Sequence, residues 1–243
     1  MPVIGCPCEV CRSSDIRDNR LRAAALIQSE DTCIAIDCGP DFRQQMLRQK
    51  VEHLDAILLT HEHNDHVIGL DEVRPFNFRT KVDMPVYGSN RVLRELRQRF
   101  PYVFDEINRY PGAPRVVQKN IHAGQVFQVQ DIEILPFEVM HGMMPVMAYR
   151  FDTFAYITDM RTISAIDFER LRGVEYLVVN ALHHFPHHSH MNVEEALHFI
   201  ERLRPRITYL THSSHQIGLH ASIEKILPPQ VRMGYDGLQI KIE

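Results

Sequence analysis

Long apolar runs are missing from this chain of 243 residues. A membrane-spanning helix needs roughly 18 or more consecutive apolar residues, and no stretch approaches that length, so we expect no membrane partner. The first residues, Met-Pro-Val-Ile-Gly-Cys, also lack the basic start and apolar centre of a signal peptide. The chain has five cysteines, an odd number, and no export signal. These absences together predict a reducing, cytoplasmic setting.

An excess of positive charge is missing as well. Lysine and arginine number 27 against 31 aspartates and glutamates, which gives a net charge of −4. That balance argues against broad nucleic-acid binding, although it leaves room for a local basic pocket. The chain shows no linker, repeat or low-complexity segment, and a hydrophobic share of 44% is enough for a sizeable core. We therefore expect a single domain over residues 1–243.

The most informative feature is the octet Leu-Thr-His-Glu-His-Asn-Asp-His at residues 59–66. It places four side chains of metal-ligand type directly after an apolar run, and these are His61, His63, Asp65 and His66. Buried imidazoles and carboxylates lose their hydration unless something binds them. A lone surface H-x-H motif usually means nothing, but this spacing lets alternate residues face one ion and the last two face another. The octet therefore predicts half of a two-metal site.

Three further side chains of ligand type follow apolar runs elsewhere in the sequence. They are His141 after residues 132–140, Asp159 after 154–158, and His212 after 207–211. Because α/β sheets place their functional sites where strands end, these residues are candidates for the remaining ligands. Imidazole and carboxylate ligands suit zinc, manganese or iron.

Three of the cysteines form a second cluster, C-x-C-x-x-C, made by Cys6, Cys8 and Cys11. Closely spaced thiols in a reducing compartment usually bind a metal, and a structural zinc takes four ligands. The fourth ligand could be Cys33, Cys38 or a histidine. Cys33 and Cys38 lie in or at the end of an apolar run, where free cysteines commonly pack. The alternative is a zinc-free cluster of reactive thiols.

These separated motifs, in this order, resemble the metallo-β-lactamase superfamily over nearly the whole chain. The cysteine motif and the later segment T-H-S-S-H-Q resemble one branch, that of the phosphoribosyl 1,2-cyclic phosphate phosphodiesterase of the carbon–phosphorus lyase pathway. The resemblance implies an α/β fold, a four-layer αβ/βα sandwich of two sheets with helices outside. Relatives begin with a strand and a Gly-Thr-Gly-type turn before the cysteines, so we expect the family's first β-strand to be absent.

The resemblance also implies ligand roles for two divalent ions, zinc or manganese, and for one structural zinc. Ligands of the first active-site ion would be His61, His63 and His141. Ligands of the second would be Asp65, His66 and His212, with Asp159 bridging the pair and Asp65 orienting the nucleophile. The structural zinc would be held by Cys6, Cys8, Cys11 and His215.

Five histidines crowd residues 183–190. We interpret His183, His184 and His188 as residues of a solvated loop. His190 precedes a capped helix and resembles the family's catalytic-side loop, so we predict that it is a general acid or a phosphate contact. His187 is a weaker second candidate for substrate contact.

Arg74 follows the octet and could clamp a phosphate through its planar fork. The alternative is an ion pair with Asp71, three residues earlier, and the sequence leaves both open. The other basic side chains of this region, such as Arg91, Arg94, Arg97 and Arg99, are expected to form a solvated helix face.

The predicted function is a binuclear metal-dependent hydrolase, a phosphodiesterase acting on a small cyclic or diester phosphate. A metal-bridging hydroxide would attack phosphorus in line, and His190 would protonate the departing oxygen. Alternatives are a transfer-RNA 3′-processing nuclease, whose Gly/Pro-rich arm we do not find, a lactone or thioester hydrolase, and an inactive zinc-stabilised binding module. The expected partner is a small phosphate ester rather than nucleic acid, and a homodimer is left open.

Apolar patterns and turn residues outline the secondary structure. They predict strands within residues 23–29, 32–37, 56–60, 84–88, 126–140, 146–159 and 176–181, and a closing pair within 231–242. They predict helices within residues 41–50, 90–99, 162–171 and 192–203. Asp41 and Asn90 are expected to cap their helices, and Asn192 with Glu195 has the spacing of a capping box.

Overall fold

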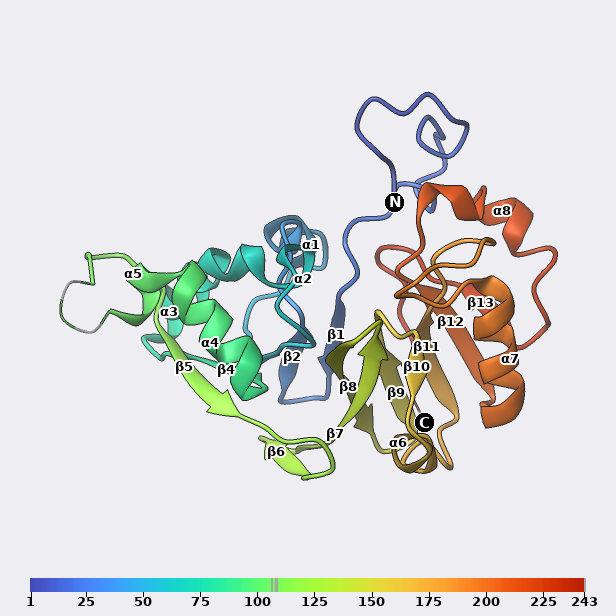
Figure 1. Cartoon of the computed structure of the whole chain (residues 1–243). Coiled ribbons are helices and arrows are strands. Elements are labelled where there is room, and N and C mark those ends of the chain that lie inside the picture. The colour runs from blue at the N-terminus through green and yellow to red at the C-terminus, as the bar shows by residue number, and fades with distance from the viewer. Residues whose placement is uncertain (106, 108, 243) are drawn as a thin grey trace. The chain divides into compact units, whose positions relative to one another are not determined.

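The computed structural model describes residues 1–242 except 106 and 108. The chain divides into two compact units (Figure 1). The first unit is Arg22–Pro136, and the second combines Met1–Leu21 with Phe137–Glu243. Each unit has its own cluster of buried apolar side chains. The single domain expected over residues 1–243 stays a prediction.

The first unit contains a sheet whose order follows the chain. Its strands are β1 (Ala25–Gln28), β2 (Cys33–Ile36), β3 (Ala56–Leu58), β4 (Met84–Gly88) and β5 (Val116–Asn120). β1 and β2 pair antiparallel, and β2 through β5 are parallel neighbours. Because parallel strands end at the same edge of a sheet, β3 delivers the octet to the carboxyl edge. No strand precedes Ala25 in the described chain.

Short helices connect and cover these strands. They are α1 (Phe42–Arg48), α2 (Asn64–Val67), the 3₁₀ helix η1 (Ile68–Val73), α3 (Arg74–Thr80), α4 (Asn90–Arg99) and α5 (Pro101–Phe104). One face of α4 is apolar and buried, and the helix lies alongside β4 and β5 (Figure 1).

Two helix caps differ from the prediction. Ser89, not Asn90, caps α4, because its side chain accepts a hydrogen bond from the backbone N–H of Val92. Asp41 occupies the N-cap position of α1 but makes no capping bond. Its carboxylate instead accepts a hydrogen bond from the backbone N–H of Arg22 at 2.8 Å.

A second sheet carries the later strands. They are β6 (Phe127–Val129), β7 (Ile132–His141), β8 (Met144–Phe151), β9 (Phe154–Ile157), β10 (Thr162–Ile163), β11 (Tyr176–Asn180), β12 (Ile207–Thr211) and β13 (Val231–Met233). The strand order is β10-β7-β8-β9-β11-β12-β13. β6 lies off this path and pairs with the first residues of β7. Both β6 and these first residues of β7 belong to the first unit. β9, β11, β12 and β13 are parallel neighbours. Their carboxyl ends therefore share one edge, where Asp159 and His212 follow β9 and β12.

The helices of the second unit are α6 (Ala165–Glu169), α7 (Val193–Leu203), the 3₁₀ helix η2 (His215–Ile217) and α8 (His220–Ile223). The predicted capping box of α7 is confirmed, since Asn192 and Glu195 each bond the other's backbone N–H. The helix predicted within 162–171 begins later, because Thr162 and Ile163 pair with β7 before Ser164 caps α6.

The hairpin predicted within residues 231–242 is wrong in its second half. In the described part of this segment only β13 is a strand. The turn residue Asp236 has another partner, because its carboxylate accepts the backbone N–H of Leu21 at 3.1 Å. This contact ties the turn to the N-terminal segment instead of to a returning strand. Among the described helices, none combines the length and apolar character needed to cross a membrane.

Candidate metal centre

In the first unit, the octet gathers its ligand-type side chains in one place. We call His61, His63, Asp65 and His66 the octet group. The ring centroid of His61 lies 4.6 Å from that of His63 and 4.2 Å from that of His66. His61 and His66 are buried, whereas His63 is exposed. The burial of two adjacent imidazoles is costly without a cation or hydrogen-bond partners.

Asp37, at the end of β2, orients the two buried imidazoles of the octet group. Its carboxylate accepts hydrogen bonds from His66 Nδ1 at 2.7 Å and from the hydroxyl of Thr60 at 2.8 Å. Because the one hydroxyl proton of Thr60 goes to Asp37, Thr60 Oγ1 accepts from His61 Nδ1, 3.0 Å away. Both imidazoles are thus held with the proton on Nδ1 and the lone pair on Nε2, the form that binds a metal.

The carboxyl of Asp37 is fully buried. Burial raises its pKa, and the hydrogen bonds from His66 and Thr60 oppose that rise. The backbone N–H of Thr60 donates to Asp37 Oδ1 at 2.8 Å as the third hydrogen bond. A buried carboxylate that receives three donors is a positioning group for neighbouring ligands.

Two glycines allow the backbone to pass closely beneath the octet group. A Cβ atom on Gly39 would lie 2.0 Å from the carbonyl oxygen of Asp65, and one on Gly69 would lie 2.1 Å from that of Gly39. The backbone N–H of Cys38 donates to the carbonyl of His66 at 2.8 Å. Any side chain at either glycine would therefore displace the segment that carries the ligands.

Helix α4 also holds the octet in place. Arg91 forms an ion pair with Glu62 at 2.8 Å. Arg99 donates to the backbone carbonyl of Glu62 and to the side chain of Asn64 at 3.0 Å. The solvated helix face predicted for these arginines is wrong for Arg91 and Arg99, because both turn back onto the octet.

Replacing Asp37 with asparagine should weaken metal binding and activity by about 10- to 100-fold, the usual effect of removing a partner of a ligand histidine. An amide offers one acceptor where three donors converge, so His66 and Thr60 would lose their fixed orientation. Metal content per chain after dialysis, together with hydrolysis rate, measures the effect. Asp31→Asn, at an exposed position, is the control. Normal metal content and activity in Asp37→Asn would contradict the positioning role.

In the second unit, three imidazoles surround one carboxylate. We call His141, Asp159, His190 and His212 the Asp159 group. Asp159 Oδ1 lies 3.3 Å from His212 Nε2 and 3.7 Å from His190 Nδ1. Ligand atoms of His141, Asp159 and His190 all lie within 4.8 Å of one another. Carboxylate and imidazole ligands are the set that zinc or manganese accepts.

The backbone of this group adopts a rare conformation. Asp159 has φ of 58° and His212 has φ of 51°, both in the left-handed region, and Asp37 in the first unit has φ of 66°. Such conformations cost free energy for residues with side chains, and they cluster at functional sites. Asn180 braces the chain after Asp159, since its buried amide accepts from the N–H of Met160 at 2.7 Å and donates to the carbonyl at 2.9 Å.

His141 is fixed by the loop that carries His190. Its Nδ1 lies 2.8 Å from the carbonyl oxygen of Ser189. A carbonyl can only accept, so Nδ1 carries the proton and Nε2 keeps its lone pair. The rings of His141 and His190 lie 4.4 Å apart, and those of His190 and His212 are stacked at 4.9 Å.

His190 lies beside Asp159, with its Nδ1 at 3.7 Å from Oδ1, which agrees with its predicted place in the site. Burial lowers the pKa of its imidazole to about 3, with further lowering by His212 and His141 and opposition from Asp159. The imidazole is therefore neutral at pH 7 in the absence of further charge. Its role as proton donor or phosphate contact stays a prediction.

Of the other histidines in residues 183–190, some are buried and some are exposed. His183 is buried and its Nδ1 accepts a hydrogen bond from the backbone N–H of Phe185, so its prediction as a solvated residue is wrong. His184 and His188 are exposed, as expected. The ring of His187 lies 5.1 Å from that of His190, which keeps it a candidate for substrate contact.

Arg74 forms the ion pair that was the alternative to phosphate binding. Its guanidinium lies 3.0 Å from the carboxylate of Asp71, which also accepts from the hydroxyl of Tyr102 at 2.8 Å. An arginine already paired with a carboxylate has less charge to offer to a phosphate. Substrate binding by Arg74 stays a prediction.

The cysteine cluster closes on His215, also in the second unit. The Sγ atoms of Cys6, Cys8 and Cys11 each lie 3.4 Å from His215 Nδ1. For tetrahedral zinc with Zn–S of about 2.3 Å and Zn–N of about 2.0–2.1 Å, a sulfur and a nitrogen ligand lie about 3.5 Å apart. The four donors therefore fit one zinc ion.

Two thiols of the cluster differ in acidity, since burial raises the pKa of Cys11 whereas that of Cys8 is lowered. The pKa of Cys8 is lowered to about 6, first by the backbone N–H of Cys11 and then by His215. A thiolate is the form that binds metal. Burial raises the pKa of Cys33 and Cys38, and both thiols pack in the interior of the first unit, as predicted.

Sequence reasoning missed Asp37, Asn180 and the carbonyl of Ser189. Asp37 ends an apolar run in the same way as the predicted ligands do, so that signal was present in the sequence. Asn180 ends the apolar strand β11 and carried a weaker signal of the same kind. A backbone carbonyl leaves no signal, because its use does not depend on residue type.

Comparisons with known proteins agree with this architecture. The family model for the Beta-lactamase superfamily domain matches residues 32–213. A solved structure described as a diphosphatase from the PhnP family is 35% identical, has a TM-score of 0.91, and covers 98% of this chain and 90% of its own. The chain belongs to the metallo-β-lactamase superfamily, in its PhnP-like branch. It has the α/β sandwich fold of that family, as the motifs predicted.

Two curated relatives are longer than this chain. It is 40% identical to an octanoyltransferase of Porphyromonas gingivalis over 245 residues, which cover 100% of this chain and 49% of that protein. It is 28% identical to the exodeoxyribonuclease WalJ of Streptococcus pneumoniae over 187 residues, which cover 74% of this chain and 62% of that protein. The chain thus spans about half the length of the octanoyltransferase and under two thirds of the exodeoxyribonuclease.

Proposed function

We propose that this chain is a metal-dependent phosphodiesterase that hydrolyses a small cyclic or diester phosphate. The observation that carries the proposal is the Asp159 group, in which one carboxylate faces imidazoles at 3.3 and 3.7 Å. The nature of the relatives supports phosphorus as the reacting atom, since a diphosphatase and an exodeoxyribonuclease both cleave bonds at phosphorus.

The octet group and the Asp159 group would supply the ligands of two divalent ions, zinc or manganese. We assign His61, His63 and His141 to one ion, Asp65, His66 and His212 to the other, and Asp159 to both. When bound, such ions would generate a nucleophile from water at neutral pH and offset negative charge on the phosphoryl oxygens. A separate structural zinc would be held by Cys6, Cys8, Cys11 and His215.

The protein's own side chains would orient the water, orient the metal ligands and donate the proton. Asp65 would orient the attacking water by accepting its hydrogen bond, and Asp37 would hold His61 and His66 in their binding orientation. His190 would donate a proton to the departing oxygen. A phosphate group next to the imidazole would favour its protonated form, which opposes the effect of burial on the pKa of His190.

His190→Ala should slow substrates with poor alkoxide leaving groups by about 10²–10⁴-fold, the usual range for general-acid catalysis. It should spare substrates that release p-nitrophenolate, because this group leaves without protonation. The comparison of kcat for a ribosyl cyclic phosphate and bis-p-nitrophenyl phosphate measures the difference. The exposed His188→Ala serves as control. Equal losses on both substrates would indicate a binding role for His190 instead.

A substrate panel with metal analysis tests the proposed function. The panel contains bis-p-nitrophenyl phosphate, a ribosyl cyclic phosphate, 2′,3′-cyclic nucleotides, single-stranded DNA, a lactone and an octanoyl thioester. We expect turnover of the small phosphodiesters, lost on chelation and restored by zinc or manganese. Faster turnover of DNA, of the lactone or of the thioester would replace the proposal with a nuclease, a lactonase or an acyl-group enzyme.

A further inference from the structure

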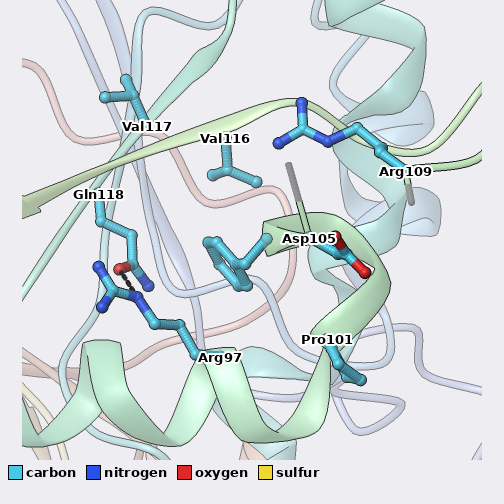
Figure 2. A pocket seen from close by; sticks show the side chains of 8 residues that line it. Arg97, Pro101, Asp105, Arg109, Val116, Val117 and Gln118 are labelled. Carbon is cyan, nitrogen blue, oxygen red and sulfur yellow. Dashed lines mark hydrogen bonds between the residues drawn. The ribbon is translucent and has the colours of Figure 1, made fainter. Parts of the chain in front are cut away.

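The first unit contains a pocket of about 610 Å³ formed by the end of α4, by α5, by Asp105 and Arg109, and by β5 (Figure 2). None of the residues that line it is a candidate metal ligand. They are Arg97, Pro101, Phe104, Asp105, Arg109, Val116, Val117 and Gln118. The pocket is therefore a feature separate from the octet group of the same unit, and the proposed hydrolysis does not use it.

One wall of the pocket presents an oriented guanidinium. Arg97 Nε donates to Gln118 Oε1 at 2.6 Å (Figure 2). Gln118 Nε2 in turn donates to the backbone carbonyl of Leu93 at 2.9 Å. This chain of hydrogen bonds restricts an otherwise flexible arginine. An arginine held in advance loses less conformational entropy when it binds an anion.

A second guanidinium has an unsatisfied donor. Within the described residues, the Nε–H of Arg109 is buried and has no hydrogen-bond partner. Leaving a buried donor of a charged group unpaired costs free energy, so such a group calls for a ligand or water. Figure 2 shows Arg109 on one side of the pocket and Arg97 with Gln118 on the other.

The rest of the lining is largely apolar. Phe104, Val116, Val117 and Pro101 provide aromatic and aliphatic surface between the polar groups. Asp105 is the one acidic lining residue, and its carboxylate accepts the backbone N–H of Ile107 at 2.9 Å. Two positive charges against one negative charge leave the lining net positive. Concave apolar surface with a few placed polar groups is typical of small-molecule sites.

We propose that this pocket is an accessory binding site for an organic anion, with a phosphate or carboxylate head on an aromatic or aliphatic body. The head accepts hydrogen bonds from Arg97 and Arg109, and the body packs on Phe104 and the two valines. The proposal goes beyond the proposed phosphodiesterase activity and does not depend on it.

Calorimetric titration of the full chain with phenylphosphonate tests the site, because this probe combines both chemical features and resists hydrolysis. Methylphosphonate and benzamide are the matched probes that lack the ring and the charge, respectively. The variants are Arg97→Ala and Arg109→Ala. Arg94→Ala is the control, since Arg94 lies on the same helix but does not line the pocket. Asp159→Ala reports on binding at the metal centre.

We expect each of Arg97→Ala and Arg109→Ala to weaken phenylphosphonate binding by about tenfold or more, as for loss of a charged hydrogen bond. Arg94→Ala should bind as the unaltered chain does, Asp159→Ala should keep the binding that Arg97→Ala and Arg109→Ala lose, and both matched probes should bind more weakly. The absence of binding at millimolar probe would overturn the proposal. So would unchanged binding in Arg97→Ala and Arg109→Ala combined with loss in Asp159→Ala, since the probe would then occupy the metal centre.

Discussion

Asp159→Ala should lower hydrolysis of phosphodiesters by about 10²-fold or more while the chain stays folded. Its carboxylate lies at the centre of the Asp159 group, 3.3 Å from His212 Nε2 and 3.7 Å from His190 Nδ1. A carboxylate assigned to both ions sets their spacing, and a displacement of about 1 Å in a catalytic group can cost about 10²-fold in rate. The measurements are kcat on bis-p-nitrophenyl phosphate and metal content per chain.

Asp152→Ala is the matched control for this experiment. Asp152 has φ of 50°, close to the 58° of Asp159, and its side chain lies exposed between β8 and β9. Alanine in the left-handed region costs about 1–3 kcal/mol at either position, so both variants lose similar stability through the backbone. Only Asp159→Ala should lose activity. Turnover and metal content equal to those of the unaltered chain in Asp159→Ala would reject the bridging assignment.

Cys8→Ser should abolish binding of the proposed structural zinc and lower Tm by about 5 °C or more. About 1 kcal/mol corresponds to about 2–4 °C for a domain of this size, and structural zinc sites contribute folding free energy directly. The three cysteines come from one short segment. His215, which completes the proposed site, lies 207 residues after Cys8 in the chain. Loss of zinc therefore frees the N-terminal segment.

The same variant should also weaken catalysis, although no cysteine belongs to the Asp159 group. His215 follows His212 by three residues, so zinc bound at His215 would also restrain the backbone that presents His212. Zinc content by elemental analysis, Tm and kcat are measured together. Cys33→Ser is the control, since it disturbs a buried thiol outside the zinc cluster. Three thiols that react freely in the native chain, with no bound zinc, would refute the site.

The local motifs could be interpreted from the sequence because their geometry is set by neighbouring residues. Residues 61–66 lie within one strand end and one helical turn, so their side chains must gather whatever the rest of the fold does. The same holds for Cys6, Cys8 and Cys11, and for the capping box of Asn192 and Glu195. Apolar runs predicted the strands because burial of alternate or continuous apolar residues is the main source of their stability.

Contacts between residues far apart in the chain were decided by the tertiary structure alone. Asp37 reaches His66 across 29 residues, and Arg99 reaches Glu62 across 37. Both contacts depend on which strand or helix lies beside β3, and residue type carries no information on that. The segment after β13 forms no second strand in the described chain because Asp236 bonds Leu21, 215 residues earlier. Turn propensity is a local preference, and a contact of that separation overrides it once the chain has folded.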